Sequence, residues 1–401
     1  MSRINGGITA PIGFVAAGIH AGIKHTKQRD LALVVSEKPG PIAGVFTTNT
    51  LPAPPVVLNR QHLKKGLGQA FVINSGNANA FTGPEGFEHA KEMGHLVASQ
   101  LGVTTSLVFV SSTGVIGVPL PMPALRKGIP RLISALRRGG HKDAAQAIMT
   151  TDTCPKAIAV QQRIGGKMVT IGGMAKGSGM IHPDMATMLA YLTTDADIDQ
   201  QTLQHTLRTV ADQSFNCISV DGETSTNDTV LCLANGMAGN TVIRRSSAAQ
   251  VQFQTLLHKA CHVLAMAICR DGEGATKVIK ICVTEAASHK AAQRFAHTLA
   301  TSPLLKTALF GADPNWGRII AALGRTGCPL RPHRIVIAFN HLKIVKDGKG
   351  LGPLVERKVR TIMRQPSFTI SVSLGMGTGT ATRWTTDLTY DYVKINASYR
   401  S

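Results

Sequence analysis

The chain has 401 residues, of which 43% are hydrophobic and 16% charged, so it can bury a sizeable core and is too apolar to be intrinsically disordered. Lysine and arginine number 43 against 23 aspartates and glutamates, which gives a formal net charge of +20. The basic residues form short scattered clusters, and aromatic residues that could stack on bases make up only 4%. We therefore predict a solvated basic surface, suited to attracting acidic metabolites, and no nucleic-acid partner.

Other protein classes are excluded by the apolar segments and the cysteines. The longest apolar stretch of helical spacing, around 261–269, is far shorter than the roughly 20 residues that cross a bilayer, so no membrane span is predicted. The segment 8–23 has no basic region of secretory type before it. Seven scattered cysteines without a Cys-x-x-Cys pair indicate buried thiols rather than disulfides or a zinc site. These features predict a cytoplasmic protein.

The first half of the chain alternates short β-rich runs with glycine-rich loops. We predict one helix at 88–101 and strands at 31–36, 44–48, 70–73, 107–111, 157–163 and 167–171. The last two runs flank Gly165-Gly166, which is typical of a hairpin turn. The loop 74–79, rich in Asn and Gly, could either offer backbone amides to a ligand or serve loop packing alone.

The second half contains longer helices. We predict helices at 201–215 and 247–270, the second capped by serine and stopped by Gly272, and strands at 277–283, 334–339 and 368–374. Strands and helices come in groups rather than in strict alternation. This favours an α/β protein of the α+β layered type.

The glycine-rich segment 172–180 does not match a known nucleotide-binding loop. A phosphate-binding loop needs Gly-Lys followed by Ser or Thr, whereas Lys176 precedes its glycine. In Gly177-x-Gly179, His182 stands where the dinucleotide fingerprint needs a third glycine. His182 and Asp184 have no matching cluster of ligands elsewhere. We therefore predict no metal and no bound cofactor.

Thr187 is, by spacing alone, a structural threonine at the head of an alternating apolar run. Its neighbours change this interpretation. The segment 176–189, with Lys176-Gly177-Ser178-Gly179-Met180 and Met185-Ala186-Thr187-Met188-Leu189, closely resembles the ornithine acetyltransferase family, the bifunctional glutamate and amino-acid N-acetyltransferases of arginine synthesis. Further motifs follow in family order over nearly the whole chain, at 6–11, 17–19, 74–80, 112–117, 150–156, 271–277, 313–318 and 392–397.

Two positions depart from the family pattern. Asp184 stands where the family commonly has asparagine, three residues before the expected cleavage point. The chain ends in Ser401 where the family often has threonine, so a hydroxyl is kept.

The resemblance implies a fold and a maturation step. It implies an α/β sandwich of the ornithine acetyltransferase and aminopeptidase type with a smaller C-terminal lobe. It also implies self-cleavage between Ala186 and Thr187, so that an alpha chain, 1–186, and a beta chain, 187–401, form one interwoven body. Two such bodies would assemble into an α2β2 heterotetramer.

The implied activity is transfer of an acetyl group from N2-acetyl-L-ornithine to L-glutamate through an acetyl-Thr187 intermediate. The resemblance assigns the oxyanion hole to Thr113 and Gly114. It assigns substrate binding to Thr153, Lys176, Thr187, Glu273, Asn396 and Ser401. Lys176 suits a carboxylate and Glu273 an ammonium group, although Glu273 could equally be a surface carboxylate, and Asn396 and Ser401 an ordinary tail. Acetyl-CoA as a second acetyl donor is left open.

Two rival functions remain at this stage. One is an aminopeptidase or amidase with the same N-terminal nucleophile and water as acceptor. The other is a basic nucleic-acid-binding module, which would stay uncut and bind in a salt-sensitive manner.

Overall fold

The computed structural model describes residues 1–182 and 188–398, which group into two compact units. The first unit contains the described residues of Met1–Met180, Asp184–Asn216 and Glu223–Ile268. The second contains those of Ile181–Pro183, Cys217–Gly222 and Cys269–Ser401. Segments from both sides of the expected cleavage point contribute to each unit.

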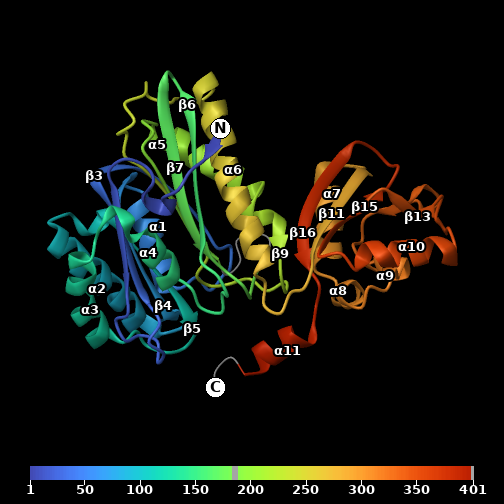
Figure 1. Ribbon diagram of the computed structural model, residues 1–401, viewed down its shortest axis with the longest axis horizontal. Helices are drawn as coiled ribbons and strands as arrows, with labels where there is room; N and C mark the ends of the chain where they lie inside the picture. The colour runs from blue at the N-terminus through green and yellow to red at the C-terminus, as the bar shows by residue number, and fades with distance from the viewer. Residues whose placement is uncertain (183–187, 399–401) are drawn as a thin grey trace. The chain divides into compact units, whose positions relative to one another are not determined.

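The first unit is built, among the described residues, around a nine-stranded sheet whose two parts, here called its two sheets, share β3 and face each other across a buried cluster (Figure 1). Within the described residues its strands pair in the order β1-β6-β7-β8-β10-β3-β4-β5, and β2 also pairs with β3. Their bounds are Ser2–Arg3 (β1), Phe14–Ile19 (β2), Leu31–Phe46 (β3), Leu67–Asn77 (β4), Val108–Val115 (β5), Lys156–Ile164 (β6), Lys167–Lys176 (β7), Leu189–Thr194 (β8) and Thr229–Ala234 (β10).

The long strand β3 belongs to both sheets. Its first part pairs with β2 and β4, its last part pairs with β10, and the register shifts between Val35 and Gly40. A Cβ atom on Gly40 would lie 1.9 Å from the carbonyl oxygen of Ala234, so glycine is required where the strand changes sheet. Between the sheets, Phe71 of β4 packs on Tyr191 of β8 with ring centroids 5.4 Å apart.

Helices cover both outer faces of this pair of sheets. Apolar residues of α1 (Pro54–Leu63), α2 (Gly83–Leu101) and α3 (Met122–Ser134) share a buried cluster with β2–β5. On the other side, α5 (Gln200–Asp212) is tied to β3 by the Gln204 amide, which accepts from the Gly44 N–H and donates to its carbonyl. The helix α6 (Ala248–Arg270) packs Leu264 against Gly173 of β7. The short helix α4 (His141–Ala147) contributes to the core between the sheets.

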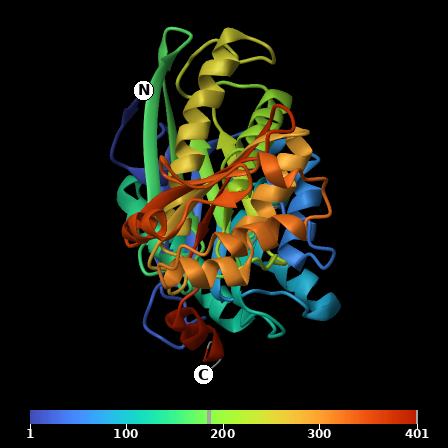
Figure 2. The same ribbon diagram turned by 90° about the vertical axis from the view of Figure 1, so that its right-hand side faces the viewer.

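The second unit is a single sheet with helices on one face (Figures 1 and 2). Within the described residues the strand order is β14-β13-β12-β15-β11-β16-β9. The strands are Ile218–Ser219 (β9), Val278–Ala286 (β11), Val336–Phe339 (β12), Leu342–Lys346 (β13), Lys349–Gly350 (β14), Ser367–Ser373 (β15) and Gly379–Thr386 (β16). The helices are His289–Ala300 (α7), Pro303–Phe310 (α8), Trp316–Gly324 (α9), Pro353–Met363 (α10) and Tyr390–Ala397 (α11).

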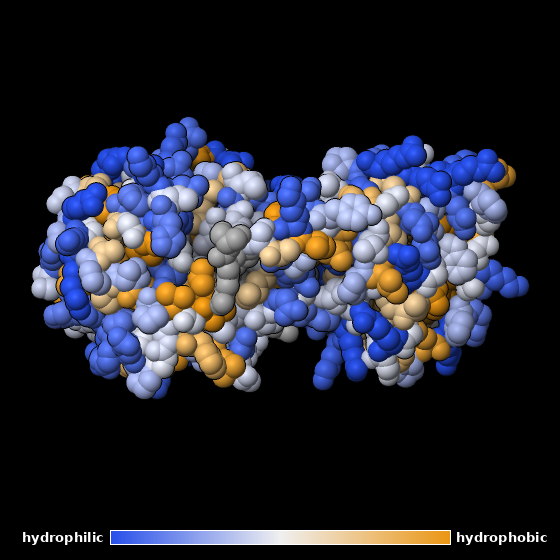
Figure 3. All heavy atoms as spheres, turned by 90° about the horizontal axis from the view of Figure 1, so that it is seen from below, coloured by the Kyte–Doolittle hydropathy of each residue, from blue (hydrophilic) through white to orange (hydrophobic). Residues whose placement is uncertain are grey.

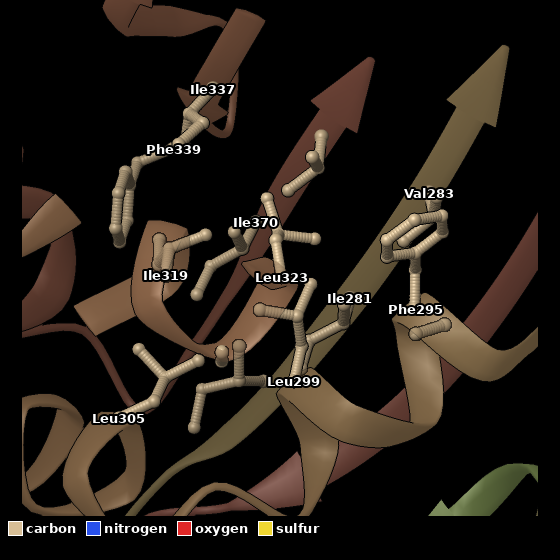
Figure 4. Close-up of a cluster of buried hydrophobic side chains, with 14 of the residues drawn as sticks. Ile281, Val283, Phe295, Leu299, Leu305, Ile319, Leu323, Ile337, Phe339 and Ile370 are labelled. Carbon is tan, nitrogen blue, oxygen red and sulfur yellow. The ribbon is translucent and has the colours of Figure 1, made fainter. Parts of the chain in front are cut away.

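The core of the second unit lies between this sheet and α7–α10 (Figure 4). Phe295 and Leu299 of α7 meet Ile281 and Val283 of β11, and Ile319 of α9 lies beside Ile370 of β15. One cation is also buried here. The Lys306 ammonium of α8 donates to the carbonyl of Thr386 and to the hydroxyls of Thr385 and Thr386 on β16, both at 3.1 Å.

The layered α/β fold with a smaller second unit confirms the fold class expected from the sequence. The predicted hairpin is β6 and β7, and Gly165 and Gly166 both have positive φ angles at its turn. The predicted serine cap is present, because Ser247 Oγ accepts from the N–H of Gln250 at 3.1 Å at the start of α6. The expected strand at 44–48 is not separate, because it forms the last part of β3.

Four of the seven cysteines are buried, as the sequence predicts for most of them. Cys217, Cys232, Cys261 and Cys269 are buried and form no disulfide, whereas Cys154 is exposed. Burial raises the pKa of both Cys232 and Cys269 to about 12. Hydrophilic residues cover much of the face of each unit seen in Figure 3. Within residues 1–182 and 188–398, no helix has the length and apolar character that a bilayer crossing requires.

The second core can be tested with Phe295→Ala. The side chain is 1% exposed, so its loss leaves a cavity and should lower the free energy of unfolding by about 3–5 kcal/mol. The control Leu304→Ala removes a side chain that is 63% exposed and should change it by less than about 0.5 kcal/mol. Equal effects of the two variants in urea unfolding would contradict this core assignment.

Candidate active site

The two predicted oxyanion residues lie at the end of β5, beside the end of β4. The strands pair in parallel, with Ser75 opposite Thr113 and Gly76 opposite Gly114. Thr113 is buried, and Gly114 has a φ angle of 134°. A Cβ atom on Gly114 would lie 2.3 Å from the carbonyl carbon of Gly76, so no other residue fits this backbone. The strand end is thus shaped by glycine, as an oxyanion site built on a backbone amide would require.

The Asn- and Gly-rich loop after β4 holds this strand end through its own side chains. The Asn74 amide donates to the carbonyl of Asn77 at 2.8 Å, and the Ser75 hydroxyl donates to that of Ala147 at 2.6 Å. The Asn77 amide donates to the carbonyls of Val118 and Pro119, both at 3.0 Å. These bonds favour the packing role of the loop over direct ligand binding by these side chains.

Lys176 ends β7 in a buried charge network. Its ammonium donates to the Thr150 hydroxyl at 2.7 Å and lies 3.6 Å from Asp152 Oδ2. Asp152 Oδ1 accepts from the Lys156 ammonium at 2.6 Å and from the N–H of Gly177 at 2.7 Å. Burial alone would raise the pKa of Asp152, but Lys176, Lys156 and the Gly177 N–H lower it well below the ordinary value. One carboxylate thus lies between two ammonium groups.

A third lysine links this network to the strand ends. Lys24 donates to the carbonyls of Met149 at 2.7 Å and Arg29 at 2.9 Å, and its side chain lies against Gly76. Burial lowers the pKa of Lys24, Asp30 opposes this effect, and the charge of Lys176 adds to it. Lys24 contacts Gly76 and lies close enough to Lys176 to feel its charge. The Gly76–Gly114 contact and Lys176 therefore belong to the same region of the first unit. No sequence motif marks Lys24 for this position.

The expected nucleophile Thr187 lies outside the described residues, as do Asp184, Ala186 and Ser401. The next residue, Met188, is described, and its N–H donates to Asp228 Oδ1 at 2.9 Å. Thr153 is exposed and directly follows the buried Asp152.

Asp228 was not identified from the sequence, because nothing in its surroundings marks a lone carboxylate between Asn227 and Thr229 as part of a site. Its contact with Met188 spans 40 residues and becomes visible only in the fold.

In the second unit, the structure brings two of the predicted substrate-binding residues together. Glu273 is buried just after the end of α6, and its Oε2 accepts from the amide of Asn396 on α11 at 2.9 Å. Gly274 permits the approach of this helix, because a Cβ there would lie 2.4 Å from the Tyr392 nitrogen. Glu273 is therefore a buried, partnered carboxylate rather than a surface one.

His, Cys, Asp and Glu side chains are the candidate metal ligands of the chain. No group of three or more that could hold a metal ion is found in the described part of the chain.

The sequence profile of the ArgJ family matches residues 15–401. The chain belongs to the ArgJ family. The Arginine biosynthesis bifunctional protein ArgJ of Symbiobacterium thermophilum is 49% identical over 403 residues, which cover 100% of both chains. The protein of the same name from Geobacter sulfurreducens is 47% identical over 389 residues, covering 97% of this chain and 99% of the relative. The expected family is thus confirmed.

Solved ArgJ structures give shorter matches. A crystal structure of Arginine biosynthesis bifunctional protein ArgJ from Bacillus halodurans shares 40% identity, covering 46% of this chain and 97% of that one with a TM-score of 0.44. The ornithine acetyltransferase of Mycobacterium tuberculosis, complexed with ornithine, shares 42% identity, covering 45% and 97% with a TM-score of 0.43.

The buried charge network predicts a pH-dependent effect of Asp152→Asn. Removing the carboxylate takes away the ion-pair partner that Asp152 supplies to the buried Lys156 and Lys176, which should lower the free energy of unfolding at pH 7 by about 3–5 kcal/mol. Because the folded-state pKa of Asp152 is depressed, its contribution is complete above the ordinary value of about 3.9 and is lost as the pH falls below it. The difference between wild type and variant in urea unfolding should therefore shrink below about pH 4.

The matched control is Glu88→Gln, which removes an exposed carboxylate paired with Lys91. Its effect on the free energy of unfolding should stay below about 1 kcal/mol at every pH. If the wild type exceeded Asp152→Asn in free energy of unfolding by the same amount from neutral to strongly acidic pH, the depressed pKa of Asp152 would be contradicted.

Proposed function

We propose that this ArgJ-family protein transfers the acetyl group of N2-acetyl-L-ornithine to L-glutamate, giving L-ornithine and N-acetyl-L-glutamate. Full-length similarity to bifunctional proteins of arginine biosynthesis carries this proposal. The protein is accordingly an acetyltransferase that acts on small molecules. Acetyl-CoA as a second donor, the cytoplasmic location and the α2β2 assembly are parts of the same proposal.

The proposed nucleophile is Thr187, released as a new N-terminus by self-cleavage after Ala186. A threonine hydroxyl is a poor nucleophile, but cleavage gives this residue an α-amine with a reference pKa of about 7.7–8.0. The amine would take the proton of the hydroxyl as the oxygen attacks the acetyl carbonyl. Ornithine would leave, and the α-amine of glutamate would then take the acetyl group from the threonine.

The oxyanion that forms at the acetyl carbonyl needs preorganised donors. Thr113 supplies a hydroxyl on a buried strand end, and Gly114 supplies a backbone N–H whose position is fixed by the close contact with Gly76. A donor of this kind lowers the barrier by about 2.7–4 kcal/mol. The rigid strand end supports the assignment that the sequence resemblance gave.

Charge supports the proposed substrate contacts within each unit. In the first unit, Lys176 is a buried ammonium group at the end of β7, which suits a substrate carboxylate. In the second unit, Glu273 is a buried carboxylate suited to an ammonium group, with Asn396 holding its orientation. Thr153, Thr187 and Ser401 complete the proposed substrate-binding set.

Intact-mass analysis of the purified protein tests the maturation step. We expect two fragments of 186 and 215 residues that meet at Ala186–Thr187, and one uncut chain for Thr187→Ala. The reason is that the hydroxyl that attacks in self-cleavage is absent from the variant. A wild-type protein that is active and uncut would overturn the proposed mechanism.

The oxyanion assignment predicts that Thr113→Val lowers kcat for acetyl transfer by about 10²–10³-fold, because the shape is kept and the hydroxyl donor is lost. Ser111→Ala is the matched control. It removes a buried hydroxyl two residues earlier on β5 and should leave kcat within about twofold. Steady-state assays of the cleaved proteins, normalised to the amount of beta chain, measure both. Equal losses in the two variants would argue against a special role of Thr113.

Product analysis distinguishes the proposed acetyltransferase from the rival function, an aminopeptidase or amidase with water as acceptor. Transfer of labelled acetyl from acetylornithine to glutamate supports the proposal, whereas free acetate as the main product would make the protein an amidase.

A further inference from the structure

Lys24 lies in the loop between β2 and β3, and its side chain is held at both ends. Its backbone N–H donates to Asp30 Oδ2 at 3.0 Å, and its ammonium group donates to the carbonyls of Met149 at 2.7 Å and Arg29 at 2.9 Å. Between these anchors the stem lies against Gly76, where a Cβ atom would be 2.9 Å from Lys24 Cγ. Two of the three N–H groups of the ammonium are thus used on backbone carbonyls of a half-buried side chain.

The buried carboxylate of Asp30 fixes the loop that carries Lys24. It accepts from the four consecutive N–H groups of residues 21–24 at 2.6–3.1 Å, and the residue is 0% exposed. The Asp30 carbonyl also accepts from the N–H of Ser75 on β4 at 2.9 Å. The loop is therefore attached to the end of β4, and the side chain of Lys24 starts from a fixed point.

The stem of Lys24 supports the strand end on which the proposed oxyanion site is built. Gly76 is in close contact with this stem and with Gly114, since a Cβ atom on Gly114 would be 2.3 Å from the Gly76 carbonyl carbon. The position of the Gly114 N–H therefore depends on Gly76, and that of Gly76 on what packs against it.

The ammonium end of Lys24 reaches the segment that holds Lys176. Lys24 donates to the carbonyl of Met149, and the hydroxyl of the next residue, Thr150, accepts from the Lys176 ammonium at 2.7 Å. Two lysines thus hold two consecutive residues. One side chain connects the strand end at Gly76 with the immediate surroundings of Lys176.

The two places that Lys24 connects are proposed to bind two groups of one substrate molecule. In N2-acetyl-L-ornithine only the amide nitrogen and the α-carbon separate the acetyl carbonyl from the carboxylate, so the separation of these groups is nearly fixed. The oxyanion donors Thr113 and Gly114 must therefore keep a matching separation from Lys176. A misplacement of about 1 Å in such a site can cost about 10²-fold in rate.

We propose that Lys24 is a positioning residue that sets the separation between the oxyanion site at Gly114 and the carboxylate site at Lys176. It thereby favours acetyl donors with a carboxylate on the carbon that bears the acetylated nitrogen, the class of Nα-acetyl amino acids. This inference rests on the proposed acetyl transfer and adds a determinant of donor specificity to it.

The variant that tests the proposal is Lys24→Met in the full-length, self-processed protein. Methionine keeps most of the stem against Gly76 and loses the ammonium donors. We expect cleavage as in the wild type by intact mass. At saturating glutamate, kcat with acetylornithine should fall about 10- to 100-fold and KM should stay within about threefold, because Lys176 still binds the carboxylate while the acetyl carbonyl no longer meets the oxyanion donors.

A second acetyl donor separates positioning from general damage to the site. p-Nitrophenyl acetate has no carboxylate, and its burst of nitrophenol measures acetylation of the enzyme. In Lys24→Met the rate constant of this burst should stay within about threefold of wild type, because no carboxylate has to be matched. Equal losses with both donors, or no loss with acetylornithine, would overturn the proposal. So would a raised KM with unchanged kcat, since Lys24 would then bind the carboxylate itself.

Two further variants complete the experiment. Lys65→Met removes another cation of the first unit, which donates to the Ser106 hydroxyl at 3.2 Å, and should leave both rates within about twofold of wild type. Lys24→Arg keeps the charge and the N–H donors, so its kcat with acetylornithine should exceed that of Lys24→Met by about fivefold or more. A cleaved and folded Lys24→Arg protein as impaired as Lys24→Met would contradict the connection through Met149.

The state of the purified proteins distinguishes the possible failures. An uncut Lys24→Met protein would refute the inference, because Lys24 would then serve folding or maturation rather than the placement of the donor. Failure of the wild type itself to cleave or to transfer acetyl would instead refute the proposed function.

Discussion

The first unit depends on one constraint, which is that β3 must serve two sheets. Its 16 residues pair with β2 and β4 at one end and with β10 at the other, and the change is possible because Gly40 approaches the backbone at Ala234. Since side chains alternate along a strand, the apolar face of each sheet is then turned toward the other. The buried cluster that contains Phe71 and Tyr191 follows from this arrangement.

The polar residues of the site lie where this apolar layer ends. Phe109 of β5 and Met174 of β7 belong to the inter-sheet cluster, and further along the same strands come Thr113 and Lys176. Burial of a lysine at such a place is costly unless a carboxylate accompanies it, which explains Asp152. The rigid layer therefore sets the position of the site, and the charge network makes it compatible with the buried surroundings.

Much of this organisation could be predicted from local patterns. The turn at Gly165-Gly166 and the serine before α6 are local signals, and both predicted elements are present. The helices α1 and α3 are not among the predicted elements. Prolines in their first turns are compatible with a helix, but Pro130 inside α3 is unfavourable there, so tertiary packing decides in α3. Local sequence patterns cannot predict which strands far apart in the chain pair with each other.

The residues of the candidate site likewise fall into those that sequence motifs indicate and those that only long-range contacts reveal. Motif resemblance supplied Thr113, Gly114 and Lys176, and the structure shows how the backbone and charges place them. Asp152 lies inside the motif at 150–156, but its role as a partner of two lysines depends on β6 and β7 meeting. Lys24 and Asp228 have no local signature, because their contacts are with residues 125 and 40 positions away.

The pairing of β7 with β8 bears on how such a protein can be handled. These strands lie on opposite sides of the Ala186–Thr187 bond and form antiparallel pairs from Ile171 with Thr194 to Lys176 with Leu189. Either piece produced alone would expose an unsatisfied strand edge of apolar sequence, which is a template for aggregation. A gene divided at this bond would therefore need both products in the same cell at the same time, since each completes the other's sheet.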